Sequence, residues 1–290
     1  MQFAPSELIL NQDGSIYHLN LLPQDLASII ITVGDPDRVE RVTKHFDKIT
    51  VTKHKREFKA QTGTYKGKSI TVISTGIGTD NIDIVLNELD ALANINFKTR
   101  RVNDKLKSLK IIRLGTSGAI QPEIAVDSIL VSKMAIGLDS LLHFYDSGHL
   151  QNSNIQDAFV KHCDWAAEKS LPYVVDADQQ LLNHFTEKNY HIGFTATNVG
   201  FYAPQGRLLR GKLQDANLNA KLSSFNHNGL KITNLEMETS GIYGLAKLLG
   251  HQAVSINAIL ANRSLETFSE NGDKTVDFMI ESALERIKLL

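Results

Sequence analysis

Short runs rich in Ile and Val alternate along this chain with segments that have the period of an amphipathic helix. The runs have the length and β-branched content of buried strands, and they lie at 28–33, 68–74, 109–115, 127–132, 192–197 and 252–261. At the C-terminal end, helical spacing relates Val276, Met279, Ile280, Ala283, Leu284 and Ile287. This alternation predicts an α/β fold around a largely buried sheet.

The chain length is compatible with one or two domains. At about 150 residues per domain, 290 residues suggest two, but single α/β domains also reach this size. No repeat and no Pro/Gly-rich linker divides the sequence. We therefore expect a single domain over 1–290, with an N-terminal extension over 1–15 and a charged, exposed insertion over 96–110.

Composition argues against several classes of protein. The net charge of −1 gives no electrostatic basis for binding nucleic acid or an anionic membrane. Cys163 is the only cysteine, which excludes an intrachain disulfide and a cysteine-rich metal site, and its amphipathic surroundings predict a buried, unreactive thiol. The N-terminus has no signal-peptide pattern, and no apolar run approaches the ~20 residues of a membrane span. We expect a soluble cytoplasmic protein.

Polar residues and glycines follow three of the expected strands. VGDPDR (33–38) contains Gly34 and Arg38, STGIGTDN (74–81) is a Gly-rich turn into a helix, and IIRLGTSGAIQP (111–122) contains Arg113 and Thr116. Ligands gather at the ends of strands in open α/β sheets. A guanidinium inside an apolar strand is costly unless it pairs with an anion, and arginine matches phosphate oxygens well. These residues predict a phosphate site; the alternative for Arg113 and for Arg38 is a structural salt bridge. The missing P-loop pattern argues against nucleoside triphosphate hydrolysis.

The stretch LEMETSGIYG (235–244) places Glu236 and Glu238 on either side of Met237. If the preceding LKITNLEM is a strand, both carboxylates point to the same side at its end. A ligand or cation could use them there. Alternatively, they form a solvated strand end that favours the N-terminus of the following helix. The residues alone leave both interpretations open.

Several motifs in register resemble the nucleoside phosphorylases, and within them the uridine phosphorylases. They are GDPDR, HKREF, STGIG, IIRLGTSGAIQP, FYAPQGR and EMETSGIYG, and the resemblance extends over about 17–264. It implies a single α/β domain with a mixed, partly barrel-like central sheet flanked by helices. It also implies a pentosyltransferase that converts uridine and phosphate to uracil and ribose 1-phosphate.

The resemblance assigns the phosphate site to Gly34, Arg38, Arg113 and Thr116. It adds Arg56, which would complete this site across a subunit interface. We therefore expect a homo-oligomer, at least a dimer and most simply a hexamer.

For the ribose, the resemblance implies that Glu238 accepts hydrogen bonds from the hydroxyls and that Met237 packs on the sugar. Glu236 would support the same region. His18 would cross the subunit interface to meet the 5′-hydroxyl.

For the base, it implies that Phe201 stacks on the ring, and that Gln205 and Arg207 read its polar edge, with Arg263 nearby. A polar turn built on proline and glycine would explain the composition of YAPQGR equally well. Purine-cleaving relatives carry an aspartate near ANRS, where this chain has Asn262 and Arg263, so a pyrimidine is favoured. The expected catalytic residues are Arg113, Arg207 and Glu238.

We expect no metal or organic cofactor. Some relatives bind a monovalent cation near the residue matching Glu57, but Asn81 replaces a serine there, so the sequence leaves a structural cation at the interface open. The alternatives are a purine nucleoside phosphorylase, a nucleosidase that uses water, or a catalytically silent nucleoside-binding protein. The order APQGR departs from the family pattern, which leaves the preference among uridine, deoxyuridine and thymidine open. A salvage and a catabolic role also remain open.

Overall fold

Strand β7 (Lys110–Ala119) lies at the centre of the sheet and pairs with three other strands. In the computed structural model, which describes residues 2–290, β7 runs parallel to β1 (Ile29–Val33) and β14 (Gln252–Asn262) and antiparallel to β13 (Asn234–Glu236). Every residue of β1 is buried, and β7 and β14 are buried over most of their length. Their Ile- and Val-rich sequences suit strands that are covered on both faces.

Five strands close into a ring of hydrogen-bonded neighbours. From β7 the ring passes through β14 to β8 (Ile129–Gly137), then to β10 (His191–Thr197) and β13, and returns to β7. The pairings within the ring are both parallel and antiparallel. The expectation of a mixed, partly barrel-like sheet is therefore confirmed.

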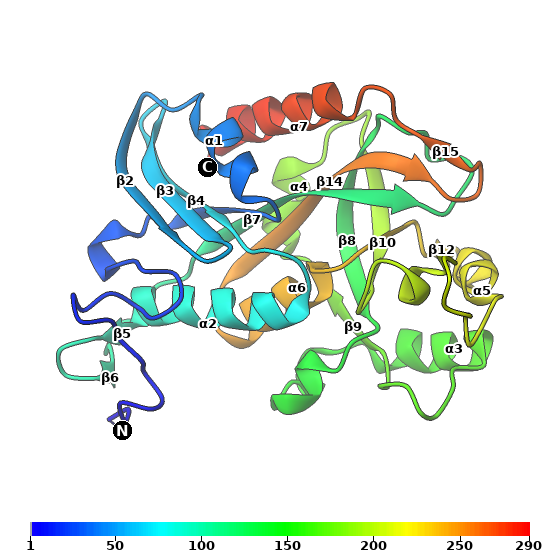
Figure 1. Ribbon diagram of the computed structural model, residues 1–290, viewed down its shortest axis with the longest axis horizontal. Helices are drawn as coiled ribbons and strands as arrows, with labels where there is room; N and C mark the ends of the chain where they lie inside the picture. The colour runs from blue at the N-terminus through cyan, green and yellow to red at the C-terminus, as the bar shows by residue number, and fades with distance from the viewer. Residues whose placement is uncertain (1) are drawn as a thin grey trace.

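On the other side of β1, the sheet continues as an open wing of three strands. The wing runs through β4 (Lys68–Ser74) and β3 (Phe58–Tyr65) to β2 (Lys48–Lys55) at its edge (Figure 1). The sequence analysis identified β4 but not β2 or β3. Strand β2 is largely exposed and carries four lysines and histidines in KITVTKHK, so it lacks the apolar run by which the buried strands were recognised.

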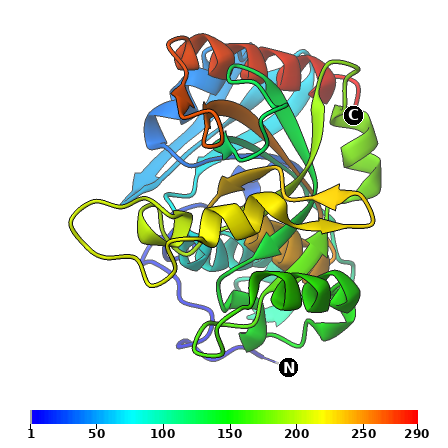
Figure 2. The same cartoon turned by 90° about the vertical axis from the view of Figure 1, so that its right-hand side faces the viewer.

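Helices flank the sheet on both sides (Figures 1 and 2). Above it in Figure 1, α1 packs on β3 and β4, while α7 packs on β14 and β7. Below it, α2 packs against α6, which covers β14 and β8. The helices are α1 (Pro36–Thr43), α2 (Thr79–Asn94), α3 (Ser153–Cys163), α4 (Gln179–Phe185), α5 (Leu218–Ser224), α6 (Thr239–Leu248) and α7 (Gly272–Ile287).

Short strands lie mainly at the periphery. Strand β9 pairs with β8, β15 pairs with β14, and two separate hairpins join β5 to β6 and β11 to β12. Their bounds are β5 (Ile95–Asn96), β6 (Arg101–Val102), β9 (Tyr173–Asp176), β11 (Asn226–His227), β12 (Leu230–Lys231) and β15 (Thr267–Phe268). The strand-like run LKITNLEM is thus divided between β12 and β13.

The 96–110 stretch contains most of the β5–β6 hairpin, and its side chains are mainly exposed. The hairpin holds the N-terminal segment, because the Arg100 guanidinium donates hydrogen bonds to the backbone carbonyls of Phe3, Ala4 and Leu8. The boundaries that the sequence suggested for an extension and an insertion remain predictions.

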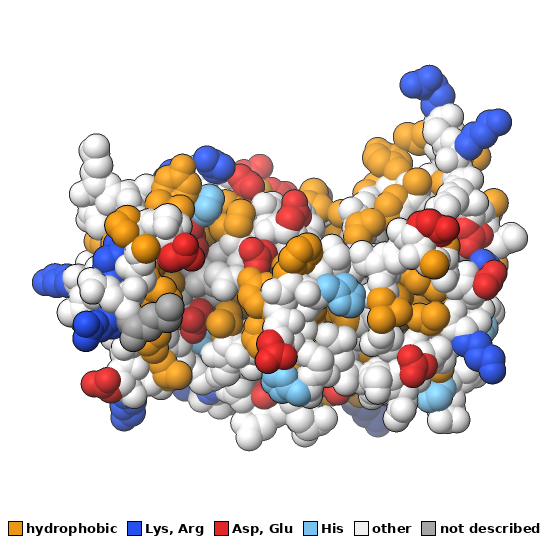
Figure 3. All heavy atoms as spheres, turned by 90° about the horizontal axis from the view of Figure 1, so that it is seen from below, with side chains coloured by type: hydrophobic (Ala, Val, Ile, Leu, Met, Phe, Trp, Pro, Cys, Tyr) orange, Lys and Arg blue, Asp and Glu red, His pale blue; other side chains and the backbone are white. Residues whose placement is uncertain are grey.

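The apolar stripe of α7 is buried as predicted, from Val276 to Ile287. In α6, Ile242, Leu245 and Ala246 are buried, and Gly250 follows the helix with a φ of 78°. No helix within residues 2–290 has the length and apolar character needed to cross a bilayer. On the face drawn in Figure 3, acidic and basic side chains are interspersed among hydrophobic and neutral ones.

The buried position of Cys163 gives a test of this fold. The side chain is 1% exposed at the end of α3, and burial raises the pKa of the thiol to about 12. Because the thiolate is the reactive form, alkylation of the native protein at pH 8 should be roughly 1,000-fold slower than alkylation of the unfolded chain. Labelling kinetics with and without guanidinium measure this ratio. Rates within tenfold of each other would contradict the described packing of α3.

Candidate active site

A cavity of about 640 Å³ opens where β1, β7 and β13 meet the loops that follow β1 and β4. The loop between β10 and α5 forms another part of its wall, and this loop projects from the body of the molecule (Figure 2). The predicted site residues that line the cavity are Gly34, Arg38, Arg113, Thr116, Phe201, Gln205, Arg207, Glu236, Met237 and Glu238. The structure therefore brings together most of the residues singled out in the sequence.

Arg113 and two glutamates form a buried ion-pair cluster in the wall of this cavity. Arg113 Nη2 lies 2.6 Å from Glu238 Oε2 and 3.1 Å from Glu236 Oε2. Burial lowers the pKa of Arg113, but the two carboxylates outweigh it and raise the pKa above its ordinary value. Burial also raises the pKa of Glu238, and Arg113 opposes that rise. With one positive charge for two carboxyl groups, ionisation of Glu238 depends on Arg113.

Glu236 uses both carboxylate oxygens within the chain. Its Oε1 accepts a hydrogen bond from Thr197 Oγ1 at 2.6 Å. Its Oε2 accepts from the backbone N–H groups of Glu238 and Thr239, each at 2.9 Å, and from Thr239 Oγ1 at 2.8 Å. Glu236 therefore anchors the start of α6 and pairs with Arg113, and little acceptor capacity is left for a sugar. This arrangement favours a supporting role over direct ribose contact.

The Glu238 carboxylate keeps more of its capacity to accept hydrogen bonds from a ligand. One oxygen accepts from Arg113, and the other accepts from the backbone N–H of Gly78 at 2.8 Å. Each carboxylate oxygen has a further lone pair. Met237 lies between the two glutamates, is half-buried and lines the cavity. The carboxylate pair is thus not a solvated strand end.

The other side of the Arg113 guanidinium is held by β14. Nη1 donates to Asn257 Oδ1 at 2.9 Å and to Ser255 Oγ at 3.3 Å. The group lies over Gly115, where an added Cβ would be 1.9 Å from Nη1. Both Nη atoms are therefore committed to protein groups, and Nε is the remaining donor of the five N–H groups of arginine.

Arg38 lies on α1 and is much less constrained. The only hydrogen bond of its guanidinium within residues 2–290 is a long one, from Nη1 to the carbonyl oxygen of Leu114 at 3.4 Å. Burial lowers the pKa of Arg38, and the nearby charge of Arg113 lowers it further. A buried guanidinium in this state is well suited to an anion. Gly34 and Thr116 line the same part of the cavity wall.

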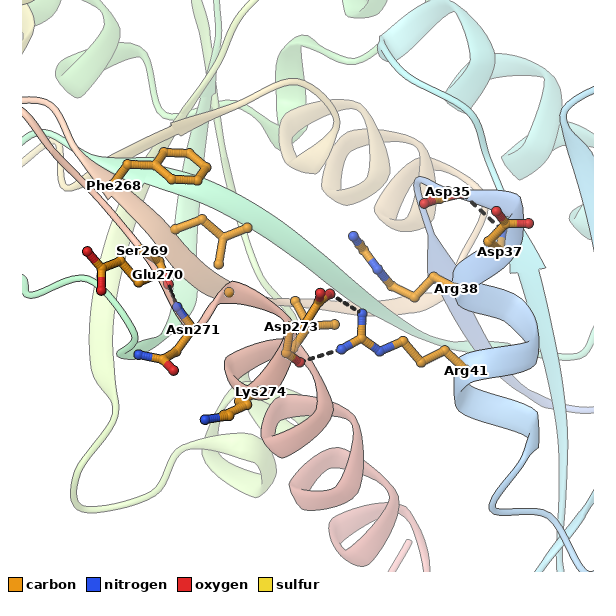
Figure 4. Close-up of a pocket in the computed structure, with 13 residues that line it drawn as sticks. Asp35, Asp37, Arg38, Arg41, Phe268, Ser269, Glu270, Asn271, Asp273 and Lys274 are labelled. Carbon is orange, nitrogen blue, oxygen red and sulfur yellow. Dashed lines mark hydrogen bonds and ion pairs between the residues drawn. The ribbon is translucent and has the colours of Figure 1, made fainter.

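Arg41, one turn further along α1, is already neutralised. Its guanidinium donates to Asp273 Oδ1 at 2.8 Å and to Asp277 Oδ1 at 2.7 Å, both on α7. Figure 4 shows Arg41 directed toward Asp273 while Arg38 extends away from this pair. Of these two arginines, Arg38 is the one available to a ligand.

In the part of the cavity wall formed by the loop between β10 and α5, Arg207 contacts both Phe201 and Gln205. The Arg207 guanidinium lies over the Phe201 ring, with Cζ 3.8 Å from the ring centroid. Its Nη1 donates to Gln205 Oε1 at 2.6 Å and to the Phe201 carbonyl oxygen at 2.7 Å. Gln205 is 3% exposed, and because Arg207 holds its oxygen, its Nε2 is left to donate. Burial lowers the pKa of Arg207, and Arg263 contributes to the same shift.

Comparison with known proteins identifies the family. The sequence model of the phosphorylase superfamily matches residues 28–290. The chain belongs to the phosphorylase superfamily. It is 30% identical over 295 residues to a uridine phosphorylase of Thermococcus kodakarensis, covering 100% of this chain and 91% of that protein. It is also 28% identical over 273 residues to a DeoD-type purine nucleoside phosphorylase of Colwellia psychrerythraea, covering 93% and 98% of the two chains.

A solved structure agrees with this family. The crystal structure of a Trypanosoma brucei nucleoside phosphorylase that shows uridine phosphorylase activity matches with a TM-score of 0.88 at 31% identity. The match covers 98% of this phosphorylase and 100% of the trypanosomal chain. The resemblance to nucleoside phosphorylases, and among them to uridine phosphorylases, is confirmed.

Three predicted residues do not line the cavity of this phosphorylase. His18 pairs through Nδ1 with Glu88 Oε1 at 2.7 Å. Arg56 is exposed at the turn between β2 and β3, with a φ of 56°. Arg263 follows β14, and its Nη1 is buried without a hydrogen-bond partner in the described chain. The roles of His18 and Arg56 toward a neighbouring subunit remain predictions.

The sequence analysis missed the polar residues that support the cluster. Ser255 and Asn257 lie two apart in the apolar run AVSINAILA, so they occupy the same face of β14. That spacing was a signal available in the sequence. Thr197 had no comparable signal, because a threonine in a buried strand is ordinary. Within residues 2–290, no three His, Cys, Asp or Glu side chains are placed to hold a metal ion.

Gly115 tests whether the position of Arg113 matters. In Gly115→Ala, the new methyl group would displace the Arg113 guanidinium, because the Cβ position lies 1.9 Å from Nη1. Losing one or two charged hydrogen bonds should lower kcat/KM for the nucleoside roughly 10- to 1,000-fold. Gly148→Ala is the control, since Gly148 does not line the cavity and its added Cβ would meet no atom of residues 2–290 within 4 Å. Equal kinetics in the two variants would contradict the role assigned to Arg113.

Proposed function

We propose that this phosphorylase cleaves uridine with inorganic phosphate and releases uracil and ribose 1-phosphate. The observation that carries the proposal is that groups suited to a phosphate, a sugar and a base line the same cavity. Unpaired Arg38 suits a phosphate, the Glu238 carboxylate suits sugar hydroxyls, and the Gln205 amide suits the polar edge of a pyrimidine. The uridine phosphorylases among the relatives support the same assignment.

The reaction breaks the bond between C1′ of the ribose and N1 of the base. The base leaves with the electron pair of that bond and then takes up a proton, while a phosphate oxygen forms the new bond to C1′. The ribose passes through a state with positive, oxocarbenium-like charge. An ionised Glu238 bound to the ribose hydroxyls and a phosphate anion on the opposite face both stabilise this charge. Arg113 contributes by keeping the Glu238 carboxyl group ionised.

At the base end, Gln205 and Arg207 stabilise the leaving group. The amide Nε2 of Gln205 can donate to a carbonyl oxygen of uracil. The Arg207 guanidinium can offset the negative charge that develops as the base departs. Phe201 and Arg207 are stacked on each other in this structure, so one face of the ring is covered by a cation. Arg263 lies near enough to Arg207 to lower its pKa and adds to the positive potential here.

A purine nucleoside is the second candidate substrate. Identity to the purine-cleaving relative is 28%, almost the same as the 30% to a uridine phosphorylase, so overall identity does not select the base. The amide of Asn262 donates to the carbonyl oxygens of Gln121 and Ile124, so this side chain is engaged in the fold and not directed at a base. Without an acidic group at this position, protonation of a leaving purine is disfavoured.

We further propose that the enzyme acts in the cytoplasm, in pyrimidine nucleoside salvage or catabolism, as a homo-oligomer with the hexamer as the simplest form. His18 and Arg56 do not line the cavity of their own chain. This supports a homo-oligomer, in which each could contact the site of a neighbouring copy. Inorganic phosphate is a co-substrate, and the proposed chemistry needs no metal or organic cofactor.

Release of free base from uridine and inosine, with and without phosphate, tests the proposal. We expect uracil from uridine only when phosphate is present, because phosphate is the attacking group. Chromatography of the reaction mixtures quantifies both bases. Hypoxanthine as the main product would favour the purine assignment. Release of base without phosphate would show a hydrolase and would overturn the role of Arg38.

Substitution of the two arginines of α1 distinguishes an effect on phosphate binding from an effect on stability. In Arg38→Met, loss of the unpaired guanidinium should raise KM for phosphate at least about tenfold, since a charged hydrogen bond contributes ~1.5–3 kcal/mol. In Arg41→Met, the melting temperature should fall while KM for phosphate changes little, because Arg41 is paired with α7. Steady-state kinetics at varied phosphate concentration give KM for the two variants, and thermal denaturation gives their melting temperatures. A larger phosphate effect in the Arg41 variant would reverse the assignment.

A further inference from the structure

Asn257 occupies an unusual position in the core of the barrel. It lies in β14 and is 0% exposed, in register with Gly115 of β7, while Ser255 is in register with Arg113. The amide is fully engaged: Oδ1 accepts from Arg113 at 2.9 Å, and Nδ2 lies 3.2 Å from the hydroxyl oxygens of Ser132 and Ser255.

A buried amide in an apolar strand contributes little to stability in comparison with an apolar side chain of similar size. Its transfer from water costs free energy, and its hydrogen bonds mainly offset that cost. Among residues 2–290, the only charged group bonded to the Asn257 side chain is the guanidinium of Arg113. The other β14 residue that bonds this guanidinium, Ser255, does so at the longer distance of 3.3 Å. This contact points to the role of the side chain.

We propose that Asn257 is a positioning residue for Arg113, which it holds by one side of the guanidinium so that the other side faces Glu238. The guanidinium is planar, so fixing Nη1 also fixes the direction of Nη2. Gly115 leaves the space above its Cα open, and the guanidinium occupies that space. Without the Asn257 acceptor, the group could tilt within this space and lengthen the 2.6 Å contact to Glu238.

A change in the position of Arg113 would alter the ionisation of Glu238. The charged and titratable groups that act on this part of the site are Arg113 of β7, Glu236 of β13, Arg38 of α1, Tyr243 of α6 and Tyr173 of β9, with Asp139 bonded to Tyr173. Among them, Arg113 is the cation in direct contact with the carboxylate. A displaced Arg113 would let burial and the charge of Glu236 raise the pKa of Glu238, and a protonated Glu238 would lose acceptor capacity for ribose hydroxyls.

The first experiment measures stability against pH and does not depend on the substrate. Asn257→Leu removes the acceptor and keeps a similar volume. A carboxyl group with a raised folded-state pKa loses stabilisation as pH rises through that pKa. The loss of melting temperature in Asn257→Leu relative to wild type should therefore grow from about pH 5 to pH 8. Asn257→Ser, which keeps a hydroxyl acceptor, should show a smaller dependence.

Asn262→Leu is the matched control. Asn262 lies on the same strand and is 1% exposed. In the part of the chain that the structure describes, its side chain bonds only backbone groups, those of Gln121, Ile124, Ser264 and Leu265. Its replacement should lower the melting temperature by a similar amount at every pH. If the stability loss in Asn257→Leu is equally independent of pH, Asn257 is a packing residue and the inference is overturned.

The second experiment is the pH profile of uracil release, which rests on the proposed function. In Asn257→Leu, kcat/KM for uridine should fall roughly 10- to 100-fold near neutral pH, as expected for one lost charged hydrogen bond. The acid limb of the profile should move to higher pH, whereas Asn262→Leu should leave its position unchanged. An unmoved limb would contradict the inference. If wild type itself releases no uracil, the proposed function fails, and the stability measurement still decides the role of Asn257.

Discussion

The contact between Arg113 and the two buried carboxyl groups is the interaction around which the site is organised. One cation serves Glu236 and Glu238 in a water-poor position, at 3.1 and 2.6 Å. Removing one partner of a buried pair typically costs about 3–5 kcal/mol, because the remaining charge stays without compensation. Arg113 is therefore needed for the stability of the barrel as well as for chemistry. The effect of substituting Arg113 therefore cannot be interpreted as the loss of a phosphate contact alone.

The closed ring of strands fixes the relative positions of the residues in this cluster. Arg113 lies on β7, Glu236 on β13 and Asn257 on β14, and both neighbouring strands are hydrogen-bonded directly to β7. Strand pairing fixes the register of the three elements, so their side chains meet without help from a loop. Glu238 follows β13 directly, and Glu236 holds its backbone N–H. The charges of this cluster thus lie on, or directly beside, the paired strands of the ring.

The sequence predicted the buried strands and the wall of the cavity, because both leave local signals. Ile- and Val-rich runs identified β1, β4, β7, β8, β10 and β14, whereas exposed β2 and short β9 had no such run. Motif residues such as Arg38 and Gln205 were found through strand ends and family resemblance. Two features were not predictable: the hydrogen bonds within the chain that occupy both oxygens of Glu236, and the pairing of Arg41 with α7. Both depend on contacts between segments far apart in the chain.

The groups that we propose bind the base and those that we propose bind the sugar and phosphate belong to different parts of the fold. Phe201, Gln205 and Arg207 all come from one projecting loop between β10 and α5, and they contact one another. The Arg113 cluster belongs to the strands. Substitutions in the loop can therefore alter which base is accepted while leaving the charge balance of the barrel intact. Such a division makes the enzyme readily evolvable, with one chemical core able to acquire new leaving-group preferences through changes in a single surface segment.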